Sequence, residues 1–116
     1  MDDPLLLAHL NLDVADLPRS AAFYGEHLEL PVDVSDAAVR VKWPSFLLVL
    51  TPGTPRASDN FHFGFRVATS ADVDAWMSRL RARDVPIVAE AERRGSVYVA
   101  RITDPDAYVI EVFTFL

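Results

Sequence analysis

Two histidines and one glutamate are the side chains in this sequence that can be combined into a metal-binding site. His9 and His62 each begin a six-residue segment with the same pattern of His, apolar, variable, apolar, charged and Val. Glu111 is the only charged residue in the apolar segment 108–115. Two imidazoles and one carboxylate suit a borderline divalent cation and leave coordination positions open for a substrate.

A structural interpretation of the same residues competes with the metal site. On its own strand face Glu111 is flanked by Val109 and Phe113, where a carboxylate is costly unless a partner compensates it. A divalent cation is one such partner, and Arg101 or Arg66 is another. In the second case the two histidines are ordinary structural residues. Their equivalent placement in a repeat favours the metal site.

The elements that must position these residues also repeat. Residues 9–14 and 62–67 alternate in polarity, which predicts strands with one buried face. A helix is expected after each strand, capped by Asp16 in the first half and by Thr69 or Ser70 in the second. Further strands are predicted at 38–43 and 46–51, and at 86–89, 97–103 and 108–115. The charged run 90–94 is expected to be an exposed turn.

Each half therefore consists of a strand, a helix and two or three further strands. This pattern predicts an α+β fold with one domain over residues 1–116, in which module one covers 5–52 and module two covers 60–116. The segment 52–59 is rich in turn-forming residues and is expected to link them. Neither module can bury its sheet alone, whereas two together can.

The composition excludes several classes of function. The formal net charge is -6 and the pI about 4.8, which argues against binding to nucleic acid or to an anionic membrane. The sequence has no Cys, so disulfides and thiolate sites are excluded. The acidic N-terminus, with its short apolar run, is neither a signal peptide nor a spanning segment, and a cytoplasmic location is expected.

The sequence resembles the vicinal oxygen chelate superfamily, which includes glyoxalase I, extradiol dioxygenases, methylmalonyl-CoA epimerase, fosfomycin-resistance enzymes and bleomycin-resistance proteins. Residues 9–17, continuing to Leu28, resemble its opening signature, and residues 61–65 resemble the start of its second module. The closing signature is similar to Asp104-Pro105-Asp106 followed by Glu111. Glycines common in this family are replaced by Glu29 and Ala107.

The resemblance implies two βαβββ modules whose mixed sheets curl into a cup around the site. It assigns His9, His62 and Glu111 as ligands of Mn, Fe, Zn or Ni. No second acid-base residue is evident, so either the Glu111 carboxylate, released from the metal, or a bound water is expected to act in catalysis. The fourth ligand position is expected at Leu48, which cannot bind a metal. Three ligands fit extradiol dioxygenases and fosfomycin enzymes, whereas glyoxalase I and the epimerase use four.

Four further residues are candidates for contacting the substrate, each with an ordinary alternative. Arg101 can hold a carboxylate or phosphonate, or pair with Glu111. Asn11 lies two residues after the first histidine, where fosfomycin enzymes usually carry Thr. Tyr98 can donate a proton or simply pack, and Trp43 can line a pocket or mark a bend before Pro44.

Two functions follow from these expectations. The first is a metal-dependent lyase, isomerase, transferase or dioxygenase acting on a small molecule that chelates the metal through neighbouring oxygens. The alternative is a non-catalytic protein that sequesters an antibiotic or metabolite, as bleomycin-resistance proteins do, which the acidic balance suits. The family also implies a homodimer, in which modules can swap between chains.

Overall fold

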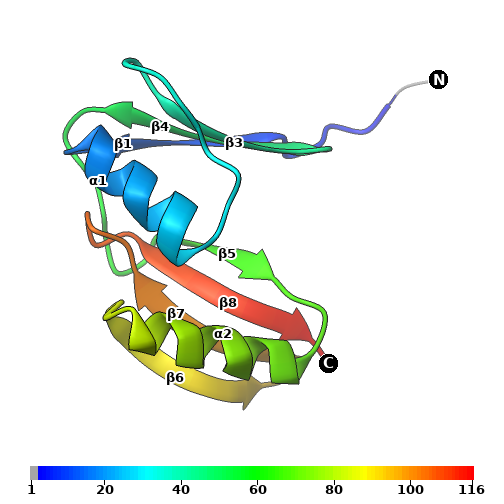
Figure 1. Cartoon of the computed structure of the whole chain (residues 1–116). Coiled ribbons are helices and arrows are strands. Elements are labelled where there is room, and N and C mark those ends of the chain that lie inside the picture. Colours follow the sequence, from blue (N-terminus) through cyan, green and yellow to red (C-terminus); the bar gives the residue numbers. More distant parts are fainter. Residues whose placement is uncertain (1–2) are drawn as a thin grey trace. The chain divides into compact units, whose positions relative to one another are not determined.

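A computed structural model describes residues 3–116. The chain divides into two compact units, the first ending at Pro55 and the second beginning at Arg56. Each unit holds a four-stranded mixed sheet and one helical segment (Figure 1). The predicted α+β fold of two βαβββ modules is confirmed. Within the described chain, no helix combines the length and the apolar composition that crossing a bilayer requires.

The first unit contains a sheet of strand order β1-β4-β3-β2, in which only the β1–β4 pair is parallel. The helix begins after Asp16, whose Oδ1 accepts a hydrogen bond from the backbone N–H of Arg19 at 3.0 Å, so the predicted cap is confirmed. It continues into a wider π-helical turn. Its elements are β1 (His9–Val14), α1 (Leu17–Ala22), the π-turn η1 (Phe23–His27), β2 (Asp33–Val34), β3 (Val39–Trp43) and β4 (Phe46–Pro52).

The second unit repeats this topology with the order β5-β8-β7-β6, and only the β5–β8 pair is parallel. Its helix has a capping box, in which Thr69 and Asp72 each accept a hydrogen bond from the other's backbone N–H. The cap is therefore Thr69 rather than Ser70. Its elements are β5 (His62–Arg66), α2 (Ser70–Ala82), β6 (Ile87–Arg94), β7 (Val97–Thr103) and β8 (Val109–Phe115).

The strand alternation gives each sheet one buried and one open face. In the first unit the buried face carries apolar residues and packs against α1. In the second unit the corresponding face packs against α2. The open faces carry most of the polar strand residues. The buried apolar residues of these two faces are Leu12, Val14, Val39, Val41, Leu48 and Leu50 in the first unit, and Ala100, Ile102, Ile110 and Val112 in the second.

Two expectations about local structure are wrong. The charged run 90–94 is not a turn, because β6 continues through Arg94 and the chain turns only at Gly95, whose φ is +58°. The charges lie on an edge strand, where they discourage pairing with another chain. The short strand β2 was also not predicted, since two residues leave no alternation to detect.

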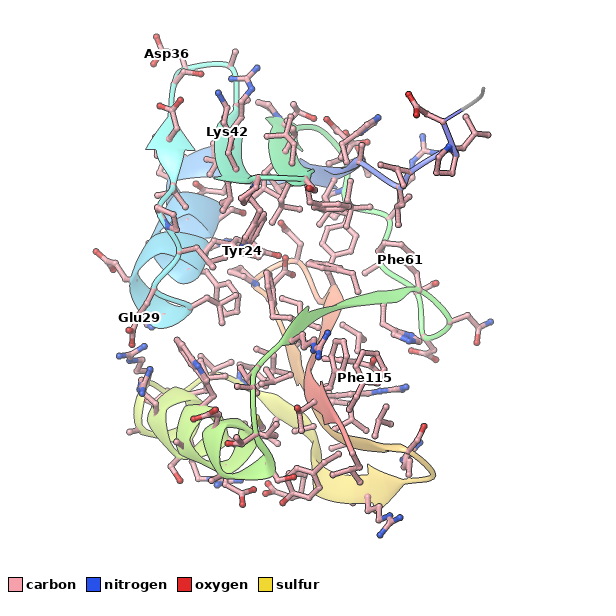
Figure 2. The ribbon with its side chains drawn as sticks, turned by 90° about the vertical axis from the view of Figure 1, so that its right-hand side faces the viewer. Tyr24, Glu29, Asp36, Lys42, Phe61 and Phe115 are labelled. Atoms are coloured by element: carbon pink, nitrogen blue, oxygen red, sulfur yellow. The ribbon has the colours of Figure 1, made fainter. Side chains whose placement is uncertain are left out.

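The two positions where the family's glycines are replaced both adopt left-handed backbone. Glu29 has a φ of +57° and Ala107 a φ of +69°. Figure 2 shows Glu29 at the surface, just beyond the first helical segment. Ala107 lies in the loop before β8, where Asp104 Oδ1 accepts hydrogen bonds from the backbone N–H groups of Asp106 and Tyr108, both at 2.9 Å. These bonds hold a conformation that alanine itself disfavours.

Replacing Ala107 with glycine should therefore stabilise the protein. We expect Ala107→Gly to raise the free energy of unfolding by about 1 kcal/mol, measured by chemical denaturation, because the strain removed exceeds the entropy that glycine adds to the unfolded chain. Ala82→Gly, at the end of α2, is the matched control and should lower it by about 0.5–1 kcal/mol. A loss of stability in both variants would refute the strain at Ala107.

Candidate functional site

The strand register of the second unit brings three predicted site residues onto one open face. Arg101 on β7 pairs directly with Glu111 on β8, and Glu111 pairs with Gly64 on β5. His62 lies two residues before Gly64 and thus on the same face. Three residues far apart in the sequence therefore lie side by side on neighbouring strands.

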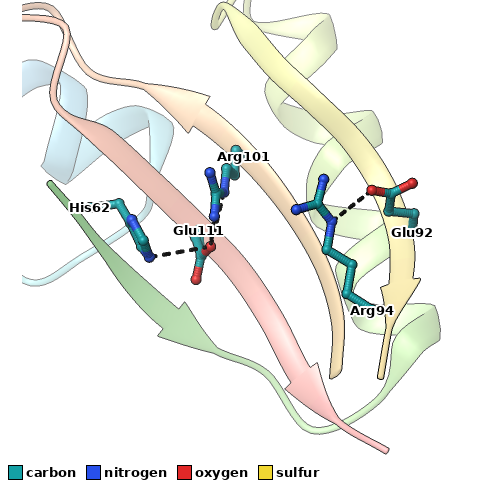
Figure 3. A network of polar contacts seen from close by, with 5 residues as sticks. All are labelled: His62, Glu92, Arg94, Arg101 and Glu111. Carbon is teal, nitrogen blue, oxygen red and sulfur yellow. Dashed lines mark hydrogen bonds and ion pairs between the residues drawn. The ribbon is translucent and has the colours of Figure 1, made fainter. Parts of the chain in front are cut away.

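The side chains meet at a single oxygen atom of the carboxylate. Arg101 donates from both Nε and Nη2 to Glu111 Oε2, at 2.9 Å each. His62 Nε2 lies 3.6 Å from the same oxygen (Figure 3). The side chains are partly exposed, at 20% for Glu111, 32% for Arg101 and 39% for His62. This cluster of His62, Arg101 and Glu111 is called the carboxylate cluster below.

The absence of a side chain at Gly64 leaves space for Glu111 on the neighbouring strand. A Cβ atom built on Gly64 would lie 3.1 Å from the Cβ and carbonyl oxygen of Glu111 and 3.1 Å from a ring carbon of Phe113. Contacts this short force a neighbour to move. A side chain at position 64 would therefore require Glu111 or Phe113 to move by a few tenths of an ångström.

The first unit presents the other predicted ligand. His9 and Asn11 lie exposed on the open face of β1, where Asn11 Nδ2 donates a hydrogen bond to Thr51 Oγ1 at 3.1 Å. His9 thus belongs to one unit and the carboxylate cluster to the other. Across residues 3–116, no three His, Asp or Glu side chains are grouped so that they could hold a metal ion.

The expected place of the fourth ligand needs a correction. In the second unit Glu111 pairs with the residue two positions after the histidine. In the first unit the residue that pairs with Asn11 is Val49, not Leu48. Leu48 is 2% exposed and lies on the buried face. The pairing of Asn11 with Val49 locates this position, and valine, like leucine, cannot bind a metal.

Tyr98 and Arg66 are engaged away from the carboxylate cluster. Tyr98 lies on the opposite face of β7 from Arg101, where its hydroxyl donates to Asp74 Oδ1 of α2 at 2.6 Å. This hydrogen bond raises the pKa of Tyr98. Arg66, the alternative partner of Glu111, lies over the ring of Phe115 at 5.0 Å from its centroid. The side chain of Tyr98 therefore lies on the helix-covered face of its sheet, away from the carboxylate cluster.

Trp43 lies at the end of β3, beside the turn to β4. It is 37% exposed and lines an open hollow of about 370 Å³ together with Lys42, Phe46 and Leu47. Trp43 and Phe46 pair across the two strands, with ring centroids 6.4 Å apart. The hollow is an apolar and aromatic surface with one ammonium group at its side.

His62 and Glu111 place two of the ligands that a divalent cation needs side by side. His62 Nε2 lies 3.6 Å from Glu111 Oε2, so an imidazole nitrogen and a carboxylate are neighbours on one open sheet face. Within residues 3–116, the hydrogen bonds and ion pairs of Glu111 all use Oε2, which leaves Oε1 open. A carboxylate ligand is commonly held by a hydrogen bond to its other oxygen, as Arg101 provides.

The family comparison agrees with this fold. The sequence pattern of the Glyoxalase/Bleomycin resistance protein/Dioxygenase superfamily matches residues 6–112. Among curated proteins, no sequence matches the chain significantly.

Solved structures with low sequence identity share the fold over nearly the whole chain. A lactoylglutathione lyase from Agrobacterium tumefaciens is 23% identical, with 97% of this chain and 96% of that chain covered and a TM-score of 0.80. A glyoxalase/bleomycin resistance protein from Albidiferax ferrireducens T118 is 20% identical, with 95% and 98% covered and a TM-score of 0.81. A family enzyme from Burkholderia phytofirmans PsJN is 15% identical, with 94% and 98% covered and a TM-score of 0.81.

The coupling between Arg101 and Glu111 can be measured by a double-mutant cycle. We expect Arg101→Gln and Glu111→Gln to show a coupling energy of about 1 kcal/mol in urea unfolding, because both charged groups are largely shielded from water. Arg94 and Glu92 form the control pair, also drawn in Figure 3, and are 59% and 55% exposed. Their coupling should be close to zero. Equal coupling in both cycles would show that the site pair is no more than a surface ion pair.

Proposed function

The chain belongs to the Glyoxalase/Bleomycin resistance protein/Dioxygenase superfamily, and we propose that it is a divalent-metal-dependent enzyme acting on a small substrate with two neighbouring oxygen atoms. His62 and Glu111 would hold the ion, with His9 as the third ligand. Mn²⁺, Fe²⁺, Zn²⁺ and Ni²⁺ suit this donor set. The observation that carries the proposal is that His62 lies beside the Glu111 carboxylate on an open sheet face, with Nε2 3.6 Å from Oε2, while Arg101 contacts Oε2 and leaves Oε1 to a ligand.

Arg101 and Glu111 would have different roles in the proposed reaction. When bound, the ion supplies a Lewis acid that polarises the substrate and stabilises developing negative charge. Arg101 holds the Glu111 carboxylate in place through Oε2. Glu111 Oε1 is then free to bind the ion or to exchange a proton with the substrate. Isomerisation, addition to an epoxide and oxygenation all lie within this chemistry.

A second function is favoured by the same contacts. The Arg101 guanidinium already compensates the charge of Glu111 without an ion, and it would repel a cation placed beside Oε2. A protein that sequesters an antibiotic or metabolite needs no metal. The net charge of -6 suits a cationic ligand.

Metal content separates the two functions. Purified protein reconstituted in turn with Mn²⁺, Fe²⁺, Zn²⁺ and Ni²⁺ should retain about one ion per chain, measured by elemental analysis after desalting. His62→Ala and Glu111→Ala should retain almost none, because each removes a ligand. His27→Ala, which changes the third histidine, is the matched control and should retain the wild-type amount.

The metal-retention experiment can also reject the proposed enzyme. Retention near zero for all four ions, or equal retention in the wild type and Glu111→Ala, would reject the enzyme and favour the sequestering protein.

The third ligand is tested by His9→Ala, which should also lose the ion. Superfamily members are often dimeric, and a homodimer offers His9 from either chain. An equal mixture of His9→Ala and Glu111→Ala chains should regain ions, relative to either variant alone, only where the two units of a site come from different chains. No recovery after subunit exchange assigns His9 and Glu111 to the same chain.

A further inference from the structure

The two units carry an arginine at the same place in their sheets. In the second unit Arg101 lies directly across from Glu111, the residue that fills the expected ligand position. In the first unit the corresponding residue is Val49, and Arg40 on β3 lies directly across from it. The register therefore makes Arg40 the structural counterpart of Arg101, on the open face of its own sheet.

The two arginines differ in what they bind. Arg101 donates two N–H groups to the carboxylate of Glu111. Arg40 faces an aliphatic side chain instead, and in the structure of residues 3–116 its guanidinium makes no hydrogen bond or ion pair. The acid nearest to it by register is Asp33 on β2, which is exposed and forms no ion pair within the described chain. Arg40 is nevertheless partly buried.

A partly buried guanidinium with no acid partner is suited to an external anion. Its planar fork of N–H donors matches the oxygens of a carboxylate or phosphoryl group. We propose that Arg40 binds an anionic oxygen group of the substrate, which makes the substrate a small acid. This inference rests on the proposed function for the reacting oxygens, but the binding of an anion at Arg40 does not require a metal.

The surroundings of Arg40 define the rest of the ligand. Val49 and Leu47 on β4 give the open face an apolar centre between Arg40 and β1. Lys42, two residues beyond Arg40 on the same face, adds a second cation at the hollow (Figure 2 labels Lys42). A substrate on this face would combine an acid group with a short apolar linker.

The sheet spacing sets the length of that linker. Arg40 and His9 lie on strands separated by β4, so their Cα atoms are about 12 Å apart, given about 4.8 Å between strands and two residues of offset along them. Both side chains can bend toward each other. A ligand that contacts both Arg40 and His9 on this face of the first unit would carry its acid group a few carbon atoms from the part that lies near His9.

The first test needs no metal. Metal-free protein is titrated with inorganic phosphate and followed by NMR at the Arg40 Nε–H and the β3 backbone amides. We expect saturable shifts centred on Arg40, and Arg40→Gln should weaken phosphate binding by about tenfold or more, since it removes a charge-assisted pair of hydrogen bonds. Arg40→Lys should bind phosphate with intermediate affinity.

The matched control removes the same charge elsewhere. Arg94→Gln changes an exposed arginine of the second unit and should leave phosphate binding within about twofold of the wild type. Unfolding midpoints of all three variants confirm that they fold. Equal weakening by Arg40→Gln and Arg94→Gln, or shifts that do not centre on β3, would overturn the proposal.

The second test concerns the substrate class. Metal-loaded protein should bind 2-oxoglutarate at least about tenfold more tightly than 2-oxopentanoate, which lacks the distal carboxylate, and Arg40→Gln should abolish that preference. Both affinities are measured by calorimetry. If the protein holds no metal but phosphate still binds at Arg40, the proposed function fails and the anion site stands. If metal binds but neither probe depends on Arg40, the anion site fails alone.

Discussion

The carboxylate of Glu111 is the group around which the second unit is organised. A negative charge between Val109 and Phe113 on a sheet face requires compensation, and Arg101 supplies it with two hydrogen bonds to one oxygen. His62 approaches the same oxygen without closing a hydrogen bond. The charge is thus held in place with one oxygen and one imidazole still available for a ligand.

The repeat shows why this arrangement occurs once rather than twice. Both units place a histidine on the first strand and an arginine on the third, with the last strand between them. Where the second unit has Glu111, the first has Val49, so the same sheet geometry yields a neutralised arginine in one unit and an unpaired one within the described residues of the other. The proposed cation site and the proposed anion site would thus arise from the same sheet geometry with one residue changed.

The sequence predicts what local chemistry decides. Asp16 and Thr69 predict where the two helices begin, because a helix cap depends only on residues within one turn. The repeated pattern after His9 and His62 predicts the strands and their open faces. The left-handed backbone at Ala107 can be predicted because glycine is common at this position in the family.

What the sequence alone misses depends on pairing between strands. The assignment of Leu48 to the fourth position failed because a shift of one residue moves a side chain to the other face, and only the pairing of Asn11 with Val49 reveals it. The importance of Arg40 stayed hidden for the same reason, since its neighbours come from other strands. The relation of His9 to the carboxylate cluster also lies beyond what a pattern within either unit can give.

The central claim is that His62 and Glu111 bind one ion together. Pulsed electron paramagnetic resonance of the Cu²⁺-loaded protein tests it most directly, because couplings to the remote imidazole nitrogens count the bound histidines. We expect two histidines in the wild type, one in His62→Gln, and an altered spectrum in Glu111→Gln. A spectrum without imidazole coupling, or one unchanged in His62→Gln, would contradict the binding of one ion by His62 and Glu111.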